Sequence, residues 1–121
     1  ENNSALTVPE LSKPYDDNVI YNFHCYEPLK FTHQGACWTD AIKPEERFTF
    51  DESNITPEFF EKLFAPAIET AKKNNTFLYC GEYGIIEIVS PEDTIKWFRT
   101  INSVFEKEPL ETENKLKFDK I

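Results

Sequence analysis

The pattern of apolar and polar positions divides the chain into alternating strand-like and helix-like segments. Residues 18–26, NVIYNFHCY, are β-branched, aromatic and almost continuously apolar, which predicts a strand covered on both faces, as in parallel sheets. Residues 76–80, TFLYC, predict a second strand. Between them, residues 27–54 form a long segment with two prolines and several aromatic residues, and long loops of this kind tend to be functional.

Two helices are predicted from apolar residues that recur every three or four positions. Thr56 can cap the first helix, Pro57 suits its first position, and Asn74-Asn75 ends it, while Pro66 is expected to kink or split it. Its apolar stripe consists of Phe60, Leu63, Phe64, Ala67, Ile68 and Ala71.

The second helix begins at Ser90-Pro91, a capping serine followed by a proline and two acids, and is expected to end near Lys107. Its predicted buried face consists of Ile95, Phe98, Ile101, Val104 and Phe105.

The order of the predicted elements favours an α/β fold with a parallel sheet. Residues 1–17 look like a connecting segment with one short helix at Ala5–Leu11, and the charged tail, residues 110–121, is left unassigned. Because two strands cannot form an independent sheet, either the connecting segments add strands or the chain is part of something larger.

Composition and charge narrow the possible partners. The chain has 121 residues with a formal net charge of −9, so nucleic acid and anionic membranes would be repelled. No apolar run approaches the ~20 residues of a membrane span, and the N-terminus has neither the basic region nor the apolar core of a signal peptide.

The cysteines and acids do not predict a metal ion or another cofactor. Cys25, Cys37 and Cys80 are odd in number and lack CxxC spacing, so we interpret them as reduced, semi-buried thiols. Cys80 is expected to point to the same side as Glu82, but it has no histidine partner in sequence that would make it a nucleophile. The remaining acids lack the calcium-loop pattern; they are Asp40, Glu45, Glu46, Asp51 and Glu52.

Three polar residues lie at the predicted carboxyl ends of the two strands. His24 and Tyr26 are two positions apart, so they point the same way on an extended strand, and Glu82 follows the second strand. Parallel strands lie ~4.8 Å apart, and sites in α/β folds form at this edge, so the three side chains could converge. Each also has an ordinary interpretation: Glu82 as a solvated turn residue, and His24 and Tyr26 as core or rim residues.

Read together, three stretches resemble a known family. NVIYNFHCYEPLKFTHQGACW, residues 18–38, resembles the sixth strand and following loop of glycoside hydrolase family 5, the cellulase-like (β/α)8 barrels. LYCGEYGI, residues 78–85, resembles its seventh strand, and SPEDTIKWFRTI, residues 90–101, is similar to the helix that follows. The resemblance implies that residues 1–121 are a single partial domain, about half of a barrel of ~250 residues.

The resemblance also implies roles. Glu82 would be the nucleophile of a retaining glycosidase, Tyr26 would keep its carboxylate oriented and ionised, His24 would contact the sugar, and Trp38 would line the cleft; loop packing is an equal alternative for Trp38. The family's acid/base glutamate sits in an Asn-Glu-Pro motif, which is absent from this chain. The isolated chain is therefore expected to be inactive.

The implied function is a secreted endo-β-1,4-glycanase that acts on plant cell-wall polysaccharide, of which this chain is a part. Its expected partners are a β-linked polysaccharide and either a second copy or the N-terminal portion of the barrel. Two alternatives remain open. One is a non-catalytic carbohydrate-binding module that presents Trp38 with Tyr26 or Tyr83; the other is an unrelated small α/β domain, in which His24, Tyr26 and Glu82 would not converge.

Overall fold

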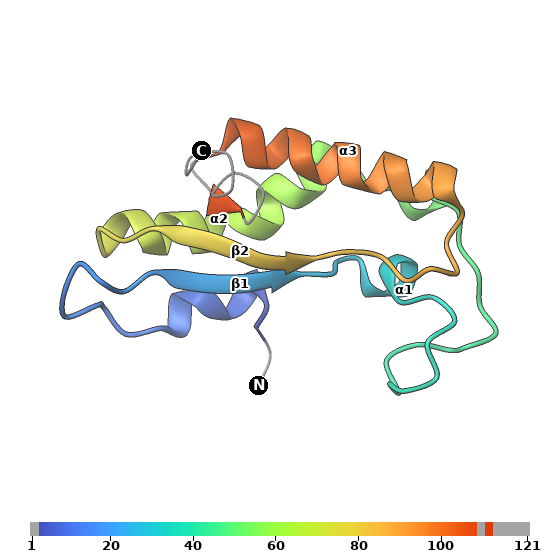
Figure 1. The fold of residues 1–121 in the computed structure, drawn as a ribbon, viewed down its shortest axis with the longest axis horizontal. Coiled ribbons are helices and arrows are strands. Elements are labelled where there is room, and N and C mark those ends of the chain that lie inside the picture. Colours follow the sequence, from blue (N-terminus) through green and yellow to red (C-terminus); the bar gives the residue numbers. More distant parts are fainter. Residues whose placement is uncertain (1–2, 109–110, 113–121) are drawn as a thin grey trace.

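The computed structural model describes residues 3–108 and 111–112, and Figure 1 shows their arrangement. The strands are β1 (Tyr21–Cys25), β2 (Leu78–Tyr83) and β3 (Glu111–Thr112). The helices are η1 (Ala5–Glu10), α1 (Leu29–Thr32), η2 (Asp51–Ser53), α2 (Pro57–Lys73) and α3 (Pro91–Lys107), of which η1 and η2 are 3-10 helices. The short helix expected at Ala5–Leu11 is therefore confirmed.

The sheet is parallel, as predicted, and has the order β1-β2-β3. β3 comes from the tail that the sequence left unassigned; the other tail residues lie outside the described part. Ser4 adds a parallel bridge to His24, so connecting segments do extend the two predicted strands. Both arrowheads in Figure 1 point toward α1 and the long loop, which gather at the carboxyl ends of β1 and β2.

The second strand is shifted relative to its prediction. It was expected at residues 76–80, but β2 begins at Leu78 and continues through Glu82 to Tyr83. Phe77 lies before the strand and is exposed. Glu82 is consequently part of the paired strand, and its position follows from the register with β1.

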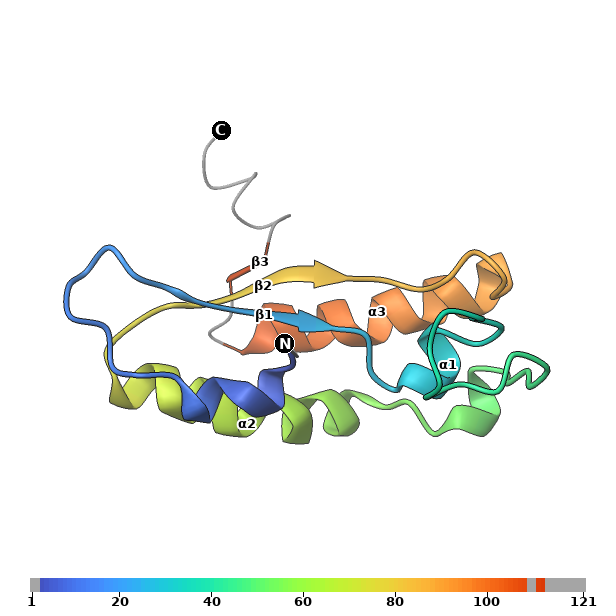
Figure 2. The ribbon, with the colours of Figure 1, turned by 90° about the horizontal axis from the view of Figure 1, so that it is seen from below.

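The helices pack against one face of the sheet, as Figure 2 shows for α2 and α3. Aromatic rings join the layers: Phe23 of β1 lies 5.3 Å from Phe64 of α2, and Phe64 lies 5.6 Å from Phe105 of α3. Thr56 caps α2 as predicted, by accepting from the Phe59 amide. Pro66 lies inside a continuous helix, so the expectation that it could split the helix is wrong.

The buried face of α3 differs from the predicted one at its first positions. Ile95 was expected to be buried but is 50% exposed, whereas Trp97 is fully buried and donates its indole N–H to the Glu27 carbonyl. Ile101, Val104 and Phe105 are buried as predicted. The large indole contacts the rings of Phe60, Tyr83 and Phe98.

The three cysteines are free thiols, but they are not alike. Cys25 and Cys80 are fully buried in the core, and Cys37 is exposed. Burial raises the pKa of Cys80 to about 12 and that of Cys25 further, which keeps both thiols protonated. None of the helices in the described residues is long and apolar enough to cross a lipid bilayer.

Candidate active site

A bulge in β2 decides where Glu82 points. β1 and β2 pair in register up to Phe23 and Cys80, but the next pair is His24 with Glu82, so Gly81 is an extra residue. Side chains alternate between the two faces of a regular strand, and one extra residue reverses the alternation beyond it. Cys80 therefore faces the core while Glu82 faces the opposite side, and the expectation that they share a side is wrong.

A hydrogen bond joins the bulge to β1. The Gly81 amide donates to Oδ1 of Asn22 on β1, at 3.1 Å. A Cβ at residue 81 would lie 2.6 Å from the same oxygen, closer than van der Waals contact allows. A side chain at residue 81 would thus displace the exposed Asn22 amide and break the hydrogen bond that ties the bulge to β1.

The three predicted residues do converge. The Tyr26 hydroxyl donates to Glu82 Oε2 at 2.8 Å, and His24 Nδ1 lies 3.3 Å from the same oxygen. The Glu82 side chain is 55% exposed, and its Oε1 makes no hydrogen bond to any residue in the described ranges. One carboxylate oxygen is thus held by two side chains, and the other remains available to a ligand.

The Tyr26 hydroxyl is a hydrogen-bond donor at this site. Partial burial, together with the hydrogen bond and charge of Glu82, raises the pKa of its phenol to about 12. The phenol consequently keeps its proton throughout the neutral range. The backbone of Tyr26 is fixed as well, because its amide donates to Glu27 Oε2 at 2.9 Å, and Glu27 Oε1 accepts from the Ser4 hydroxyl.

Trp38 lies farther along the same rim and is 68% exposed. Its ring is joined to the site through His33, which makes edge-on contacts with Tyr26 at 5.2 Å and Trp38 at 6.5 Å. Sequence reasoning missed His33, and also the role of Glu27. Both lie within residues 18–38, the first stretch of the family resemblance. A contact between the rings of Tyr26 and His33, seven residues apart in a loop, leaves no periodic pattern in the sequence that would predict it.

Tyr83 was considered as an exposed platform for a sugar, and the structure contradicts this. Beyond the bulge its side chain is on the core face, where its ring lies 5.1 Å from Phe105 and 5.8 Å from Phe98. Among the aromatic residues proposed for a binding platform, Trp38 and Tyr26 therefore remain.

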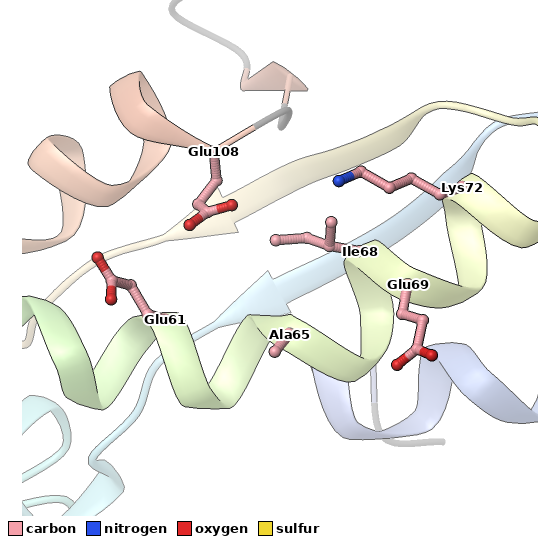
Figure 3. Close-up of a pocket in the computed structure, with 6 residues that line it drawn as sticks. All are labelled: Glu61, Ala65, Ile68, Glu69, Lys72 and Glu108. Atoms are coloured by element: carbon pink, nitrogen blue, oxygen red, sulfur yellow. The ribbon is translucent and has the colours of Figure 1, made fainter.

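A cavity lined by described residues lies away from these side chains. Figure 3 shows one of about 270 Å³ between α2 and the end of α3, lined by residues that include Glu61, Ile68 and Glu108. Glu61, one of its lining residues, forms an ion pair with Lys107 at 2.8 Å. None of the four predicted site residues lines it. Across the described ranges, no cluster of three His, Cys, Asp or Glu side chains is arranged to hold a metal ion.

Comparison with known proteins identifies the family of the chain. Residues 1–107 match the family described as Cellulase (glycosyl hydrolase family 5). Cellodextrinase A of Ruminococcus flavefaciens is 58% identical over 112 residues, which are 93% of this chain and 33% of that protein. Endoglucanase C of Acetivibrio thermocellus is 31% identical over 129 residues, with 87% of this chain and 38% of that protein covered.

A solved structure has a similar fold. A hyperthermophilic endo-β-1,4-glucanase, crystallised with substrate, superposes with a TM-score of 0.76 and 32% identity, over 91% of this chain and 35% of that one. Such neighbours are (β/α)8 barrels, so the chain has the fold of part of a barrel. It spans about a third of the length of the relatives it matches, less than the half expected from its length.

Proposed function

Because this chain belongs to the cellulase family, glycosyl hydrolase family 5, we propose that it carries the nucleophile side of a retaining β-glycosidase site. In this proposal the substrate is a β-1,4-linked glucan. Glu82 is the nucleophile, Tyr26 orients it, and His24 and Trp38 contact the sugar. The observation that carries the proposal is the convergence of the Tyr26 hydroxyl and the His24 ring on one oxygen of Glu82.

The geometry suits nucleophilic attack by a carboxylate. In the first step Glu82 Oε1 would bond to the anomeric carbon while the glycosidic C–O bond breaks, which gives a covalent glycosyl-enzyme. Oε2 stays bound to Tyr26 and His24, so the carboxylate is fixed before the substrate arrives. In the second step water attacks the same carbon and releases Glu82.

The second carboxylate of a retaining site stands ~5–5.5 Å from the first and protonates the leaving oxygen. The family's Asn-Glu-Pro motif is absent from these 121 residues. We therefore expect no hydrolysis of unactivated β-glucan or β-mannan by the purified chain. Robust turnover that disappears in Glu82→Gln would contradict this expectation.

The nucleophile can be tested without the acid. A 2,4-dinitrophenyl 2-deoxy-2-fluoro-β-cellobioside has a leaving group that needs no proton, so labelling requires only the nucleophile and a place for the sugar. Incubation followed by peptide mass spectrometry should place the fluorosugar on Glu82. The matched control is Glu87→Gln, which removes an exposed acid of the following loop. It should be labelled normally, whereas Glu82→Gln should not.

A second function is favoured by the exposure of Trp38. A flat indole face can stack on the apolar face of a pyranose, so the chain could bind glucan without catalysis. Isothermal calorimetry with cellotetraose separates the two possibilities. Binding that is abolished by Trp38→Ala and indifferent to Glu82→Gln favours the binding function, and fluorosugar labelling at Glu82 favours the catalytic one.

Self-association is a further part of the proposal. Several large apolar side chains are exposed, and an open sheet is prone to pair with other chains; the residues are Leu6, Leu11, Tyr15, Ile20 and Phe77. Sedimentation velocity over a concentration series should show a rising sedimentation coefficient. A single monomeric species at the highest concentration would contradict the idea.

A further inference from the structure

A buried threonine links the two loops that build the candidate site. Thr32 ends α1 and is fully buried. Its carbonyl accepts from the Ile86 amide at 2.8 Å, in the loop that follows Glu82. Its hydroxyl contacts both the Tyr26 carbonyl and His33 Nδ1, the latter at 3.0 Å. The residue therefore touches the backbone of one site residue and the ring beside it.

The direction of these hydrogen bonds follows from the number of protons. A threonine hydroxyl has a single hydrogen to donate, and a carbonyl oxygen can only accept. The Thr32 hydrogen must therefore point to the Tyr26 carbonyl. Thr32 Oγ1 is then an acceptor toward His33, and the contact at Nδ1 requires that this nitrogen carry a hydrogen.

We propose that Thr32 is a positioning residue that holds His33 in the Nδ1–H tautomer, which leaves Nε2 with a lone pair that accepts a hydrogen bond from a glycan hydroxyl. The tautomer rests on the contacts of Thr32 alone. The ligand part rests on the proposed function. Nε2 makes no hydrogen bond within the described residues, so it has the free capacity that a ligand would use.

The surroundings of the ring fit a neutral acceptor. Tyr26 and Trp38 make T-shaped contacts with it. Burial lowers the pKa of His33, although the nearby charge of Glu27 acts in the opposite direction. A neutral imidazole has one donor and one acceptor. With the donor used by Thr32, the ring can accept a hydrogen bond from a ligand hydroxyl but cannot donate one to the ligand.

The tautomer is measurable in the free chain. Long-range ¹H–¹⁵N correlation spectra separate protonated from unprotonated imidazole nitrogens, and the chain has only two histidines, so His33→Gln identifies the signals. In the native chain His33 should show Nδ1 protonated and Nε2 unprotonated. Thr32→Val keeps the shape and removes the hydroxyl, so Nε2–H should gain population. Thr32→Ser should restore the native spectrum, and the His24 signals should not change.

A proton on Nε2 in the native chain, or an unchanged spectrum in Thr32→Val, overturns the assignment. If Thr32→Val does not fold, the native and Thr32→Ser spectra still decide it. Titration with cellotetraose tests the ligand part: Thr32→Val should lose about two- to tenfold in affinity, the range of one hydrogen bond, and Thr32→Ser should not. Equal affinity in all three chains rejects that part. If the native chain binds no glucan, the proposed function fails while the tautomer stands on its spectrum.

Discussion

The two faces of the β1–β2 pair differ in chemistry and in role, although their residues alternate along the same strands. On the face covered by α2 and α3, the side chains are apolar and at most 3% exposed: Tyr21, Phe23, Cys25, Leu78 and Cys80. On the other face Asn22, His24 and Glu82 are polar. Asn22 accepts a hydrogen bond from the Gly81 amide of β2, and the His24 ring lies 3.3 Å from the Glu82 carboxylate. Burial of the first face stabilises the fold, whereas the polar side chains of the second face form the candidate site. Substitutions should therefore separate into those that unfold the chain and those that alter the site.

The largest effect is expected on the covered face. Trp97→Ala removes a fully buried indole and its hydrogen bond to the Glu27 carbonyl, so unfolding free energy should fall by about 3–5 kcal/mol. Chemical denaturation monitored by circular dichroism measures it. Trp38→Ala is the matched control on an exposed indole and should change stability by less than about 0.5 kcal/mol. Equal losses would show that the two regions are not distinct.

The next effect lies at the bulge, where the two faces meet. Gly81→Ala places a Cβ 2.6 Å from Asn22 Oδ1, so the exposed Asn22 side chain must rotate away and lose its hydrogen bond from the Gly81 amide, at a cost of about 0.5–1.5 kcal/mol. Because the bulge sets the register, fluorosugar labelling of Glu82 should also fall.

Gly84→Ala is the control for this change. A Cβ there would meet Tyr26 Cε1 at 3.9 Å, an ordinary contact. It should retain both labelling and stability. A neutral Gly81→Ala would mean that the bulge does not depend on the absence of a side chain.

A smaller effect on stability is expected at high pH, through the Tyr26 phenol on the open face. The pKa of the Tyr26 phenol is raised from 10.0 to about 12 by partial burial and by Glu82. Because the folded state holds this proton more tightly, its contribution to stability is complete below pH 10 and is lost as pH rises to about 12. Ultraviolet titration should show a phenol ionising near pH 12, and Tyr26→Phe should remove that step. A native titration without it contradicts the contact with Glu82.

The smallest change in stability is expected for the proposed nucleophile itself. Glu82→Gln alters an exposed side chain on the open face, so unfolding free energy should stay within about 0.5 kcal/mol of the native value. Thermal and urea denaturation would measure it. A loss above 2 kcal/mol would show that Glu82 is part of what holds the fold together.

Much of this arrangement could be predicted from the sequence, because it depends on local patterns. The capping Thr56 and Ser90 fixed the starts of both long helices, since a side-chain oxygen satisfies an amide that the helix leaves unpaired. Strand composition and the alternation of strands and helices correctly predicted a parallel sheet. The strand-end positions of His24, Tyr26 and Glu82 indicated a common site because parallel strands share one carboxyl edge.

Only the tertiary structure decided what depends on pairing between distant segments. The bulge at Gly81 is hydrogen-bonded to Asn22, 59 positions away, and it turned Glu82 to the open face and Tyr83 to the core. Trp97 took the place expected for Ile95 because its indole reaches rings on other elements. The hydrogen bond between Thr32 and His33 has no periodic signal either. Local sequence sets the propensity of each segment, whereas the register between segments sets which side chains meet.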